Sequence, residues 1–509
     1  MSGNIIIGKH TLESLTSGMY SDPFVVFREY VQNCVDSIDN AVAQGVLKSG
    51  DDQITIRLAP LDKRVIIRDN GLGISRKEAE KTLISIGNSK KSSENSRGFR
   101  GIGRLSALSY CDKLTFFTST PNEAVATKIV INAEKLAELL ANDMGEDVTI
   151  VDVLKNIYTI ETLPEKESAH YFSVQMDGVK ESSKLNSYDE VVEYLTQNVP
   201  APYSPDFVWG KEITNRLKRE GYCIDVYNIS VVFATIVTPI YKPYRDEFIV
   251  DRSKGLTDYI QDIDTIKFKH EDGDICAIGW LAKTNYLGSI NDKAVKGIRL
   301  RKGNILIGDN QTLNVVFKDA RFNGWSIGEL FAVDKQLIPN ARRDNFEKNT
   351  AYFILFEQLS HLSATIVKDI RTASLQRNSE LSNAIEKIDK TVQAANESIS
   401  VGISTPKKGA ISQKLKSAQS AVSNSATKDS TGEYFQGIAF EELDMIIGKL
   451  KGATSYKALN AIDGLTNTEK RILERVLNVI SSLDIDNSEK FIDAILNNFS
   501  SENSTVRAT

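Results

Sequence analysis

Three polar side chains on one predicted helix could do chemistry together. Apolar residues recur at helical spacing from Asp22 to Ala43, and within this stretch Glu29, Asn33 and Asp36 stand at positions i, i+4 and i+7. Side chains at this spacing project from the same face of a helix. A carboxylate there could accept a proton from an attacking water, and an amide oxygen is a hard ligand suited to Mg²⁺. The polar stripe of an ordinary surface helix would give the same pattern.

A second motif places a carboxylate before a glycine turn. In Asp69-Asn70-Gly71-Leu72-Gly73 the aspartate follows a run rich in β-branched residues, so it would end a strand. The two glycines would let the backbone turn close to a flat ligand. Asp69 could then accept a hydrogen bond from an adenine amino group, although a plain Asn-Gly turn is the commoner explanation of these residues.

A third motif clusters glycines before another predicted helix. Gly98, Gly101, Ile102 and Gly103 belong to the run GFRGIGR, which leads into the predicted helix GIGRLSALSYC. Free backbone N–H groups and the positive end of a helix dipole favour a phosphate at such a place. Each motif is common by itself, and their order and spacing make the combination specific.

Together the three motifs resemble the superfamily of gyrase, heat-shock-protein-90, histidine kinase and MutL ATPases, and most of all the heat-shock-protein-90 family. FREYVQNCVDSIDNA resembles that family's helix motif, IIRDNGLGISRKEAEKTLISIGNSKK its adenine loop and following helix, and RGFRGIGRLSALSYCDKLTFFT its lid-closing glycine motif. The resemblance is dense across residues 28–118. It implies a Bergerat-type ATPase domain that takes ATP and Mg²⁺.

The resemblance also implies a role for each residue. Glu29 would be the general base that orients water, Asn33 the Mg²⁺ ligand, Asp69 the residue that contacts adenine, and Asp36 a more peripheral support of the nucleotide. The glycine turns supply the other nucleotide contacts, which are Gly71, Gly73, Gly98, Gly101, Ile102 and Gly103. Residues from about 75 to 100 would close over the nucleotide as a lid.

Other residues are less firmly placed by the resemblance. The family sets a threonine beside the adenine, and Ser173 in HYFSVQM is the candidate to replace it. LIPNARRDNFEKN resembles the family's loop that brings an arginine to the γ-phosphate, which favours Arg343 and leaves Arg342 as an alternative. The planar guanidinium suits charge spread over phosphoryl oxygens. Arg28 either pairs with Glu29 before ATP binds or is an exposed helix arginine.

The elements that must position these residues form an α+β sandwich with helices on one face of a mixed sheet. QITIRLA and RVIIRDNG predict a hairpin, Arg76 to Ile86 a helix, and LTFFTST, TKIVINA and YFSVQMDGV further strands. We expect an ATP-binding domain at 1–200, an α/β middle domain at 201–374, a helical stalk and flexible linker at 375–432, and a small helical domain at 433–509. Strands are expected at CIDVYNI and GIRLRKGNILIGD in the middle domain.

Composition narrows the possible partners. The net charge of −5 gives no general attraction to nucleic acid or to anionic lipid. The four cysteines are isolated, so we expect buried reduced thiols, and we expect the four histidines to form no cluster with cysteine or carboxylate. Because no apolar run is long enough for a signal peptide or a membrane span, we expect a cytoplasmic protein.

These observations leave three functional hypotheses. The first is an ATP-hydrolysing conformational clamp that remodels a protein client or partner, with closure pairing two copies in a homodimer. The second is a MutL- or MORC-like clamp on nucleic acid, in defence or DNA processing. Its only support is the lysines of the expected linker, which could contact phosphates. The third, a histidine kinase, is disfavoured because no phospho-acceptor motif precedes the ATPase motifs.

Overall fold

The computed structural model describes residues 22–85, 103–141, 150–251, 255–401, 405–427, 430–453, 466–482 and 495. Two compact units divide the chain. Unit 1 contains residues 1–285 and 289–364, and unit 2 contains residues 286–288 and 365–509. The architecture is α+β: unit 1 holds mixed sheets with helices, and the described part of unit 2 is helical, so the predicted fold class is confirmed.

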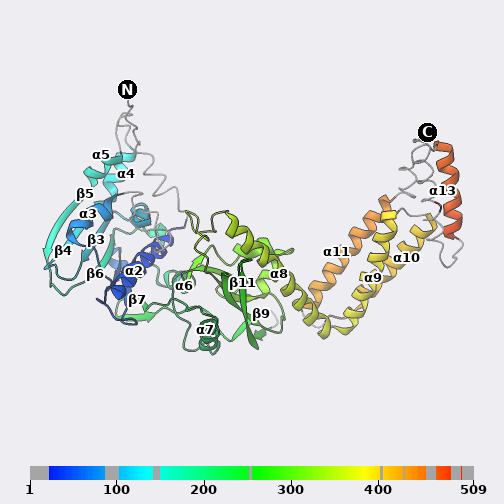
Figure 1. Ribbon diagram of the computed structural model, residues 1–509, viewed down its shortest axis with the longest axis horizontal. Helices are drawn as coiled ribbons and strands as arrows, with labels where there is room; N and C mark the ends of the chain where they lie inside the picture. The colour runs from blue at the N-terminus through cyan, green and yellow to red at the C-terminus, as the bar shows by residue number, and fades with distance from the viewer. Residues whose placement is uncertain are drawn as a thin grey trace, which may run out of the picture. The chain divides into compact units, whose positions relative to one another are not determined.

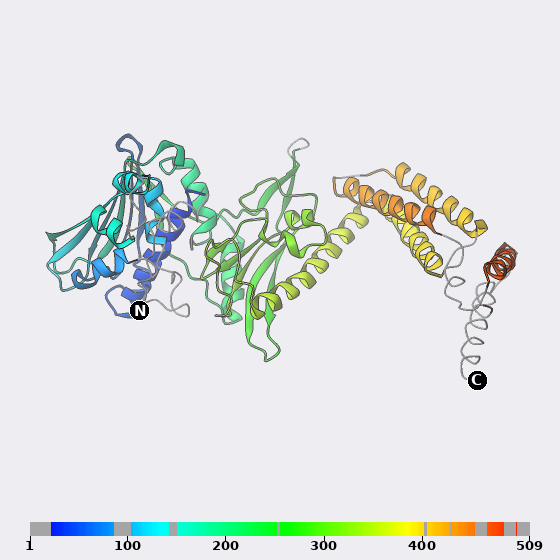
Figure 2. The same ribbon diagram turned by 90° about the horizontal axis from the view of Figure 1, so that it is seen from above.

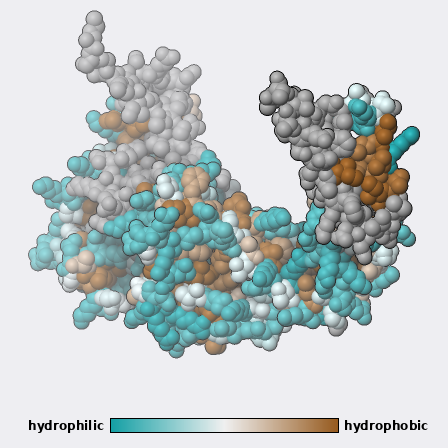
Figure 3. All heavy atoms as spheres, turned by 45° about the vertical axis from the view of Figure 1, so that its right-hand side comes forward, coloured by the Kyte–Doolittle hydropathy of each residue, from teal (hydrophilic) through white to brown (hydrophobic). Residues whose placement is uncertain are grey.

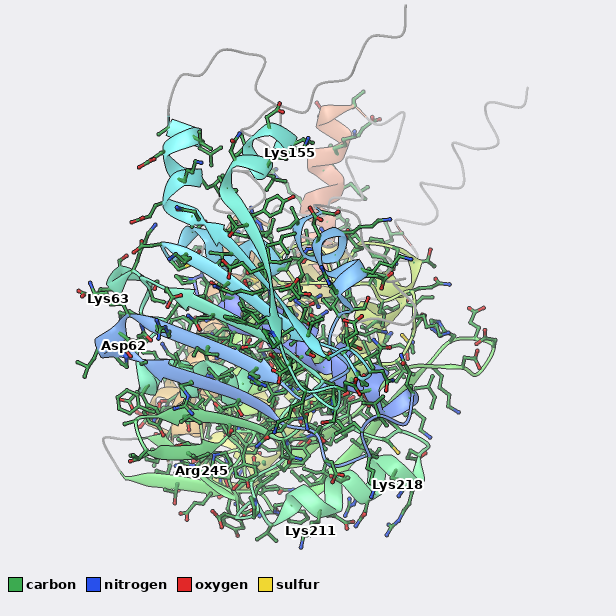
Figure 4. All side chains as sticks on the ribbon, turned by 90° about the vertical axis from the view of Figure 1, so that its left-hand side faces the viewer. Asp62, Lys63, Lys155, Lys211, Lys218 and Arg245 are labelled. Carbon is green, nitrogen blue, oxygen red and sulfur yellow. The ribbon has the colours of Figure 1, made fainter. Side chains whose placement is uncertain are left out.

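An eight-stranded sheet in unit 1 carries the first motifs. Its strand order is β5-β4-β3-β6-β2-β1-β7-β8, and all neighbours are antiparallel except β1 and β7. The predicted hairpin is confirmed, because Ile54 of β1 pairs with Asp69 at the end of β2. Figure 4 shows Asp62 and Lys63 at the turn of this hairpin. The strands are β1 (Ile54–Ala59), β2 (Arg64–Asp69), β3 (Lys113–Ser119), β4 (Val125–Asn132), β5 (Tyr158–Pro164), β6 (Tyr171–Asp177), β7 (Ile229–Phe233) and β8 (Ile236–Pro239).

The helix α2 (Val25–Ala43) lies against this sheet, as Figures 1 and 2 show. Its apolar stripe, which includes Phe27, Val31 and Ile38, is buried in one core with the strands. Burying such a stripe is what stabilises an amphipathic helix in a protein. The other helical segments of this region are α3 (Arg76–Ile84), the 3-10 helices η1 (Pro60–Asp62), η2 (Gly103–Ser109) and η3 (Glu181–Ser183), α4 (Ala133–Ala141), α5 (Ile150–Ile157) and α6 (Tyr188–Asn198).

Two details of this region differ from the sequence prediction. The stretch after Gly103 forms the short 3-10 helix η2 where an α-helix was predicted. Its Tyr110 N–H already bonds the Ala107 carbonyl three residues back, at 2.9 Å, a spacing typical of 3-10 turns. In addition, β7 and β8 belong to the first sheet although they follow residue 200, so this sheet extends past the expected domain boundary.

A five-stranded sheet follows in unit 1, in the order β11-β12-β15-β13-β14. The predicted strand pair GIRLRKGNILIGD is confirmed, since Leu300 of β13 pairs with Ile307 of β14. CIDVYNI becomes a strand only at Ile229, and before it the side chain of Asn304 donates a hydrogen bond to the Asp225 carbonyl at 2.6 Å. The elements are α7 (Trp209–Arg219), β9 (Glu247–Asp251), β10 (Leu256–Tyr259), β11 (Asp262–Lys269), β12 (Ile275–Lys283), β13 (Gly297–Lys302), β14 (Ile305–Ile307), η4 (Thr312–Val316), η5 (Ala320–Trp325) and β15 (Ile327–Ala332).

Unit 2 contains α9 (Ser379–Val401), α10 (Thr405–Asn424), α11 (Ser430–Gly452) and α13 (Asn467–Ser482), and the boundary between the units falls within α8 (Thr350–Arg377). The helices α9, α10 and α11 pack side by side (Figures 1 and 2). The predicted flexible linker is therefore wrong for 405–424. Ile411, Leu415, Ala418 and Val422 recur at helical spacing and are buried, and this stripe outweighs the polar composition.

The surface is mostly hydrophilic in the view of Figure 3, and apolar side chains gather at its upper right, where α13 lies. Ile472, Val476 and Val479 are exposed on that helix. Among the cysteines, Cys34, Cys111 and Cys276 are buried as predicted, and Cys223 is exposed because it follows α7 in an irregular stretch. Among the described residues, no helix combines the length and the apolar character that crossing a membrane requires.

Candidate functional site

The Glu29 carboxylate lies between two arginines from distant parts of unit 1. Its Oε1 is 3.4 Å from a terminal nitrogen of Arg28 and 3.3 Å from Nε of Arg343. Arg28 also donates a 3.1 Å hydrogen bond to the Arg342 carbonyl. The side chains of Arg28, Glu29 and Arg343 are all about nine-tenths buried, so these charges interact with little solvent between them. The structure thus brings the arginine loop onto the helix that carries Glu29.

The arginine loop holds Arg343 in an uncommon conformation. Arg343 has φ of 57°, in the left-handed region that side-chain-bearing residues seldom adopt. Its N–H donates to the Asn340 carbonyl at 3.1 Å, and its carbonyl accepts from Gly308 at 2.8 Å. Asn340 and Asn345 close the loop through a 2.9 Å backbone bond. Arg342, the sequence alternative, is exposed, so Arg343 is the residue whose guanidinium reaches Glu29.

Gly103 lies directly against Glu29. A Cβ atom on Gly103 would overlap Oε2 of Glu29, so a larger residue would displace the carboxylate. The neighbouring Arg104 fixes this approach, because its carbonyl accepts a 2.8 Å hydrogen bond from the Tyr30 hydroxyl of α2. The start of η2 is therefore fastened to the helix beside Glu29.

Asp69 is a buried carboxylate with one oxygen held by the protein. Its Oδ1 accepts from the Gly71 N–H at 2.7 Å, from the Phe172 N–H at 3.3 Å and from the Ser37 hydroxyl at 3.5 Å. Its Oδ2 is buried and has no hydrogen-bond partner of ordinary geometry among the described residues, although the Cys34 thiol lies near enough to the carboxylate to lower its pKa. Burial raises the pKa of Asp69 to about 6, and the hydrogen bond from Gly71 is the largest opposing effect. A buried acceptor left open in this way points to a donor supplied by a ligand.

The turn after Asp69 depends on its two glycines. A Cβ on Gly71 would overlap Oγ of Ser37, and Gly73 has φ of 71° with its Cβ direction blocked by the Ser119 carbonyl. The turn is bonded to both sides: Leu72 N–H donates to the Ser37 carbonyl at 3.1 Å, and Ile74 N–H donates to Oγ1 of Thr118 at 2.7 Å. The backbone therefore runs close to α2 and to the end of β3.

Asn33 and Asp36 complete the polar face of α2. Asn33 is partly exposed and Asp36 is buried. Both lie on the helix between Glu29 and Ser37, the residue that contacts Asp69. The helix face thus runs from the Glu29–Arg343 pair at one end to the Asp69 carboxylate at the other, with an amide and a carboxylate between them. Such a row offers oxygen ligands suited to Mg²⁺ and an acceptor for an amino group.

Comparison with known proteins agrees with this geometry. The model of the family described as "Histidine kinase-, DNA gyrase B-, and HSP90-like ATPase" matches residues 20–155, which include α2 and the Asp69 turn. Residues 20–155 form a domain that resembles the ATPase domains of histidine kinases, DNA gyrase B and heat-shock protein 90.

The relatives of this domain are chaperones by name. The chain is 27% identical over 241 residues to the chaperone protein HtpG of Chromobacterium violaceum, which covers 42% of this chain and 37% of that protein. It is 25% identical over 251 residues to HtpG of Halalkalibacterium halodurans, covering 42% and 39%. It is 26% identical over 230 residues to HtpG of Clostridium perfringens, which covers 38% of this chain and 36% of that protein. The chain thus matches less than two fifths of the length of these relatives.

The strand register of the heat-shock-protein-90-like domain corrects the expectation for Ser173. Ser173 of β6 pairs with Arg68, whereas Phe172 pairs with Asp69. Because neighbouring residues of a strand point to opposite faces, the Ser173 side chain lies on the face away from Asp69. Phe172 and Thr118 are the residues paired on the Asp69 face. Thr118, rather than Ser173, places a hydroxyl beside the glycine turn.

Several predicted contacts of the domain fall outside the described residues. Gly98, Gly101 and Ile102 lie there, as does the greater part of the expected lid, 86–100. Sequence reasoning missed Ser37 and Thr118, which both bind the Asp69 turn. Ser37 could have been found, because it continues the helical spacing of Glu29 and Asn33 by one more turn. Thr118 could not, because only the sheet brings β3 to that turn.

Proposed function

We propose that this chain binds ATP with Mg²⁺ along the polar face of α2 and hydrolyses it. The observation that carries the proposal is the buried Oδ2 of Asp69, an acceptor without a partner among the described residues. In a protein interior such an atom costs free energy unless a ligand donor reaches it. The adenine amino group is a donor of the right kind, and the close packing of Gly71 against Ser37 and of Gly73 against Ser119 fixes the turn that follows Asp69.

The phosphates would lie toward the other end of α2. Asn33 would ligate Mg²⁺ and Asp36 would support the nucleotide from the same face. Gly98, Gly101, Ile102 and Gly103 would contact the phosphates. When bound, Mg²⁺ supplies positive charge that offsets the phosphate oxygens. On this assignment the adenine and the reacting phosphate occupy opposite ends of one helix face.

Glu29 would act as the general base for the attacking water, and Arg343 would stabilise charge on the γ-phosphate. The 3.3 Å pair between them supports both roles, because it puts the guanidinium and the carboxylate at the same point. While it is paired, Glu29 cannot take up a water's proton freely, because the Arg343 guanidinium lies on the carboxylate oxygen Oε1. Transfer of Arg343 to the phosphate would release Glu29 toward the water, so that hydrolysis follows engagement of the arginine loop.

We also infer the kind of work that hydrolysis drives. The named chaperone relatives support a conformational clamp that remodels a protein client, and closure in a homodimer would fit it. The net charge of −5 provides no support for a clamp on nucleic acid. The client-remodelling proposal rests on likeness of the ATPase region, and unit 2 lies entirely beyond the family match.

The test separates binding from chemistry. ATP binding and hydrolysis with Mg²⁺ are measured for the wild type, Glu29→Ala, Asp69→Asn and Arg343→Ala, with the exposed Arg342→Ala as the matched control. Glu29→Ala should keep ATP binding and lose about 10²–10⁴-fold in hydrolysis rate. Asp69→Asn should lose binding itself, and Arg343→Ala should lose turnover while Arg342→Ala keeps it.

Opposite results have distinct meanings. A wild type that binds no ATP would remove the whole proposal. ATP binding that survives Asp69→Asn unchanged would remove the adenine assignment, and equal losses in Arg342→Ala and Arg343→Ala would remove the role of the arginine pair with Glu29.

A further inference from the structure

Three metal-ligating side chains meet at one end of the five-stranded sheet, away from the nucleotide site. His270 follows β11, Cys276 lies in β12 and Asp334 follows β15. Their ligand atoms all lie within 4.8 Å of one another. The sequence gave no sign of this cluster, because a hairpin and a neighbouring strand are needed to assemble it. The expectation that no histidine joins a cysteine or carboxylate is therefore wrong for His270.

We propose that His270, Cys276 and Asp334 form a binding site for Zn²⁺. An imidazole nitrogen, a thiolate and a carboxylate oxygen are the three kinds of ligand that Zn²⁺ takes in proteins. Three protein ligands leave a fourth tetrahedral position for water or another donor. Neither the nucleotide site nor the family match, which ends at residue 155, includes these residues.

The distances suit a small ion. Zn²⁺ bonds of about 2.0–2.3 Å in a tetrahedron put ligand atoms roughly 3.3–3.8 Å apart. Nε2 of His270 is 2.9 Å from Oδ2 of Asp334, so these two would separate by about half an ångström while the sulfur atom moves inward. Cys276 is fully buried, and the side chains of His270 and Asp334 are 20% and 14% exposed. The cluster is thus enclosed on the sulfur side and open to an entering ion on the other.

The backbone around the cluster is already fixed. Oδ1 of Asp334 accepts from the Gln336 N–H at 2.7 Å, which leaves Oδ2 directed at His270. The Asp334 N–H donates to the Cys276 carbonyl at 3.0 Å, and the His270 N–H donates to the Asp274 carbonyl at 2.9 Å. A site held in this way loses little conformational freedom when the ion binds.

Lys302 is the charge that opposes a cation here. Its Nζ donates to the Asp334 carbonyl at 2.6 Å, so an ammonium group lies beside the proposed site. A thiolate and a carboxylate offset both charges of Zn²⁺, and the thiol proton passes to solvent on binding. The remaining positive charge of Lys302 weakens the site without filling any ligand position. Replacing Lys302 with an uncharged residue should therefore strengthen Zn²⁺ binding.

Metal binding would also reach the arginine loop. Asp334 begins the segment that runs from β15 to Arg343, so a metal on Asp334 would pin the start of that segment. Any effect of the metal on ATP hydrolysis rests on the function proposed for Arg343. The binding of Zn²⁺ itself does not rest on that function, because the binding is measured without nucleotide.

The experiment uses the full-length protein without an affinity tag, freed of metal by a chelator and titrated with Zn²⁺ against a chromophoric competitor. We expect a Zn²⁺ site that His270→Ala and Asp334→Asn each weaken by at least tenfold, the lower end of what even outer-shell changes cost. Cys223→Ala, at the exposed cysteine, is the matched control and should leave it unchanged. Lys302→Met should tighten it.

A spectroscopic signature identifies the ligand set. Co²⁺ in place of Zn²⁺ should show thiolate charge-transfer absorption that Cys276→Ala abolishes and Cys223→Ala preserves. Bound Zn²⁺ should also slow amide hydrogen exchange between residues 334 and 343. No Zn²⁺ binding by the wild type, or binding that is the same in His270→Ala and Asp334→Asn, overturns the proposal even if Cys276→Ala does not fold.

Discussion

Unit 1 contains two deeply buried carboxylates whose surroundings shift their pKa values in opposite directions. Asp69 at the end of β2 is 2% exposed, and Glu329 in β15 is fully buried. The pKa of Asp69 is raised to about 6 by burial. The pKa of Glu329 is lowered to about 2, because Arg301 and Lys242 more than offset the same effect of burial. Burial alone therefore does not determine the state of a carboxylate.

The difference lies in how each carboxylate is satisfied. Both oxygens of Glu329 are bonded: Nζ of Lys242 lies 2.8 and 2.9 Å from them, Arg301 donates to Oε1, and Tyr203 donates to Oε2 at 2.6 Å. Asp69 has neutral donors on Oδ1 and no partner on Oδ2 among the described residues. The saturated Glu329 is held by its own chain, whereas the half-open Asp69 is the carboxylate for which we propose a ligand.

The largest expected effect of this difference is on stability. Glu329→Ala leaves Lys242 and Arg301 buried without a counter-charge, so it should lower the free energy of unfolding by about 3–5 kcal/mol. Asp69→Asn keeps the acceptor at Oδ1 and removes a buried charge, so it should cost nothing measurable. Chemical denaturation of both variants, followed by fluorescence, checks this. Equal losses in the two variants would mean that both carboxylates are structural.

The second effect is on nucleotide choice. The proposed acceptor Oδ2 of Asp69 suits the amino group of adenine and faces the carbonyl oxygen of guanine with like polarity. Competition binding should therefore favour ATP over GTP by about 1–3 kcal/mol, roughly 5–150-fold. Asp69→Asn should lose most of its ATP binding, and any nucleotide binding that it keeps should no longer favour ATP, because its amide can be turned to donate. Undiminished preference for ATP in that variant would assign the discrimination to other residues.

The two carboxylates should also respond oppositely to pH. Asp69 has a folded pKa above its unfolded value, so its contribution to stability is present in acid and is lost as pH rises through about 6. Glu329 has a folded pKa below its unfolded value, so its contribution is present above the unfolded value and is lost as pH falls through about 2. Since ATP requires ionised Asp69, its affinity should fall about fivefold between pH 6 and pH 5, as the ionised fraction falls from roughly a half to roughly a tenth.

Binding measured across this range checks the prediction. Tripolyphosphate, which has phosphates but no adenine, is the control for titration of the phosphates themselves. If ATP and tripolyphosphate lose affinity in parallel, the protonation of Asp69 does not govern adenine binding.

The comparison also shows what the sequence could and could not predict. Asp69 was predicted because its neighbours along the chain supply the signal, a strand followed by two glycines. Glu329 gave no signal, because its partners are distant in the sequence and meet it only after folding: Lys242 lies between β8 and β9, and Arg301 lies in β13. The spacing on α2 likewise predicted Glu29, whereas its contact with Arg343 was not predicted, because the resemblance pointed to Arg343 only as a residue for the γ-phosphate. Patterns among neighbouring residues can be predicted from the sequence, whereas contacts between residues far apart in the sequence cannot.

The smallest effect should come from the second cation of the Glu329 group. Lys242 and Arg301 together face a single carboxylate, and burial lowers the pKa of Lys242 to about 7. Lys242→Met fills the same space, leaves Glu329 paired with Arg301, and should change the free energy of unfolding by no more than about 1 kcal/mol. Arg301→Met is the matched variant and should cost clearly more, because Arg301 also bonds the carbonyls of Asn304 and Gln197. Equal losses from the two substitutions would show that Glu329 needs both cations, and that its saturation depends on total charge rather than on the bonds of Arg301.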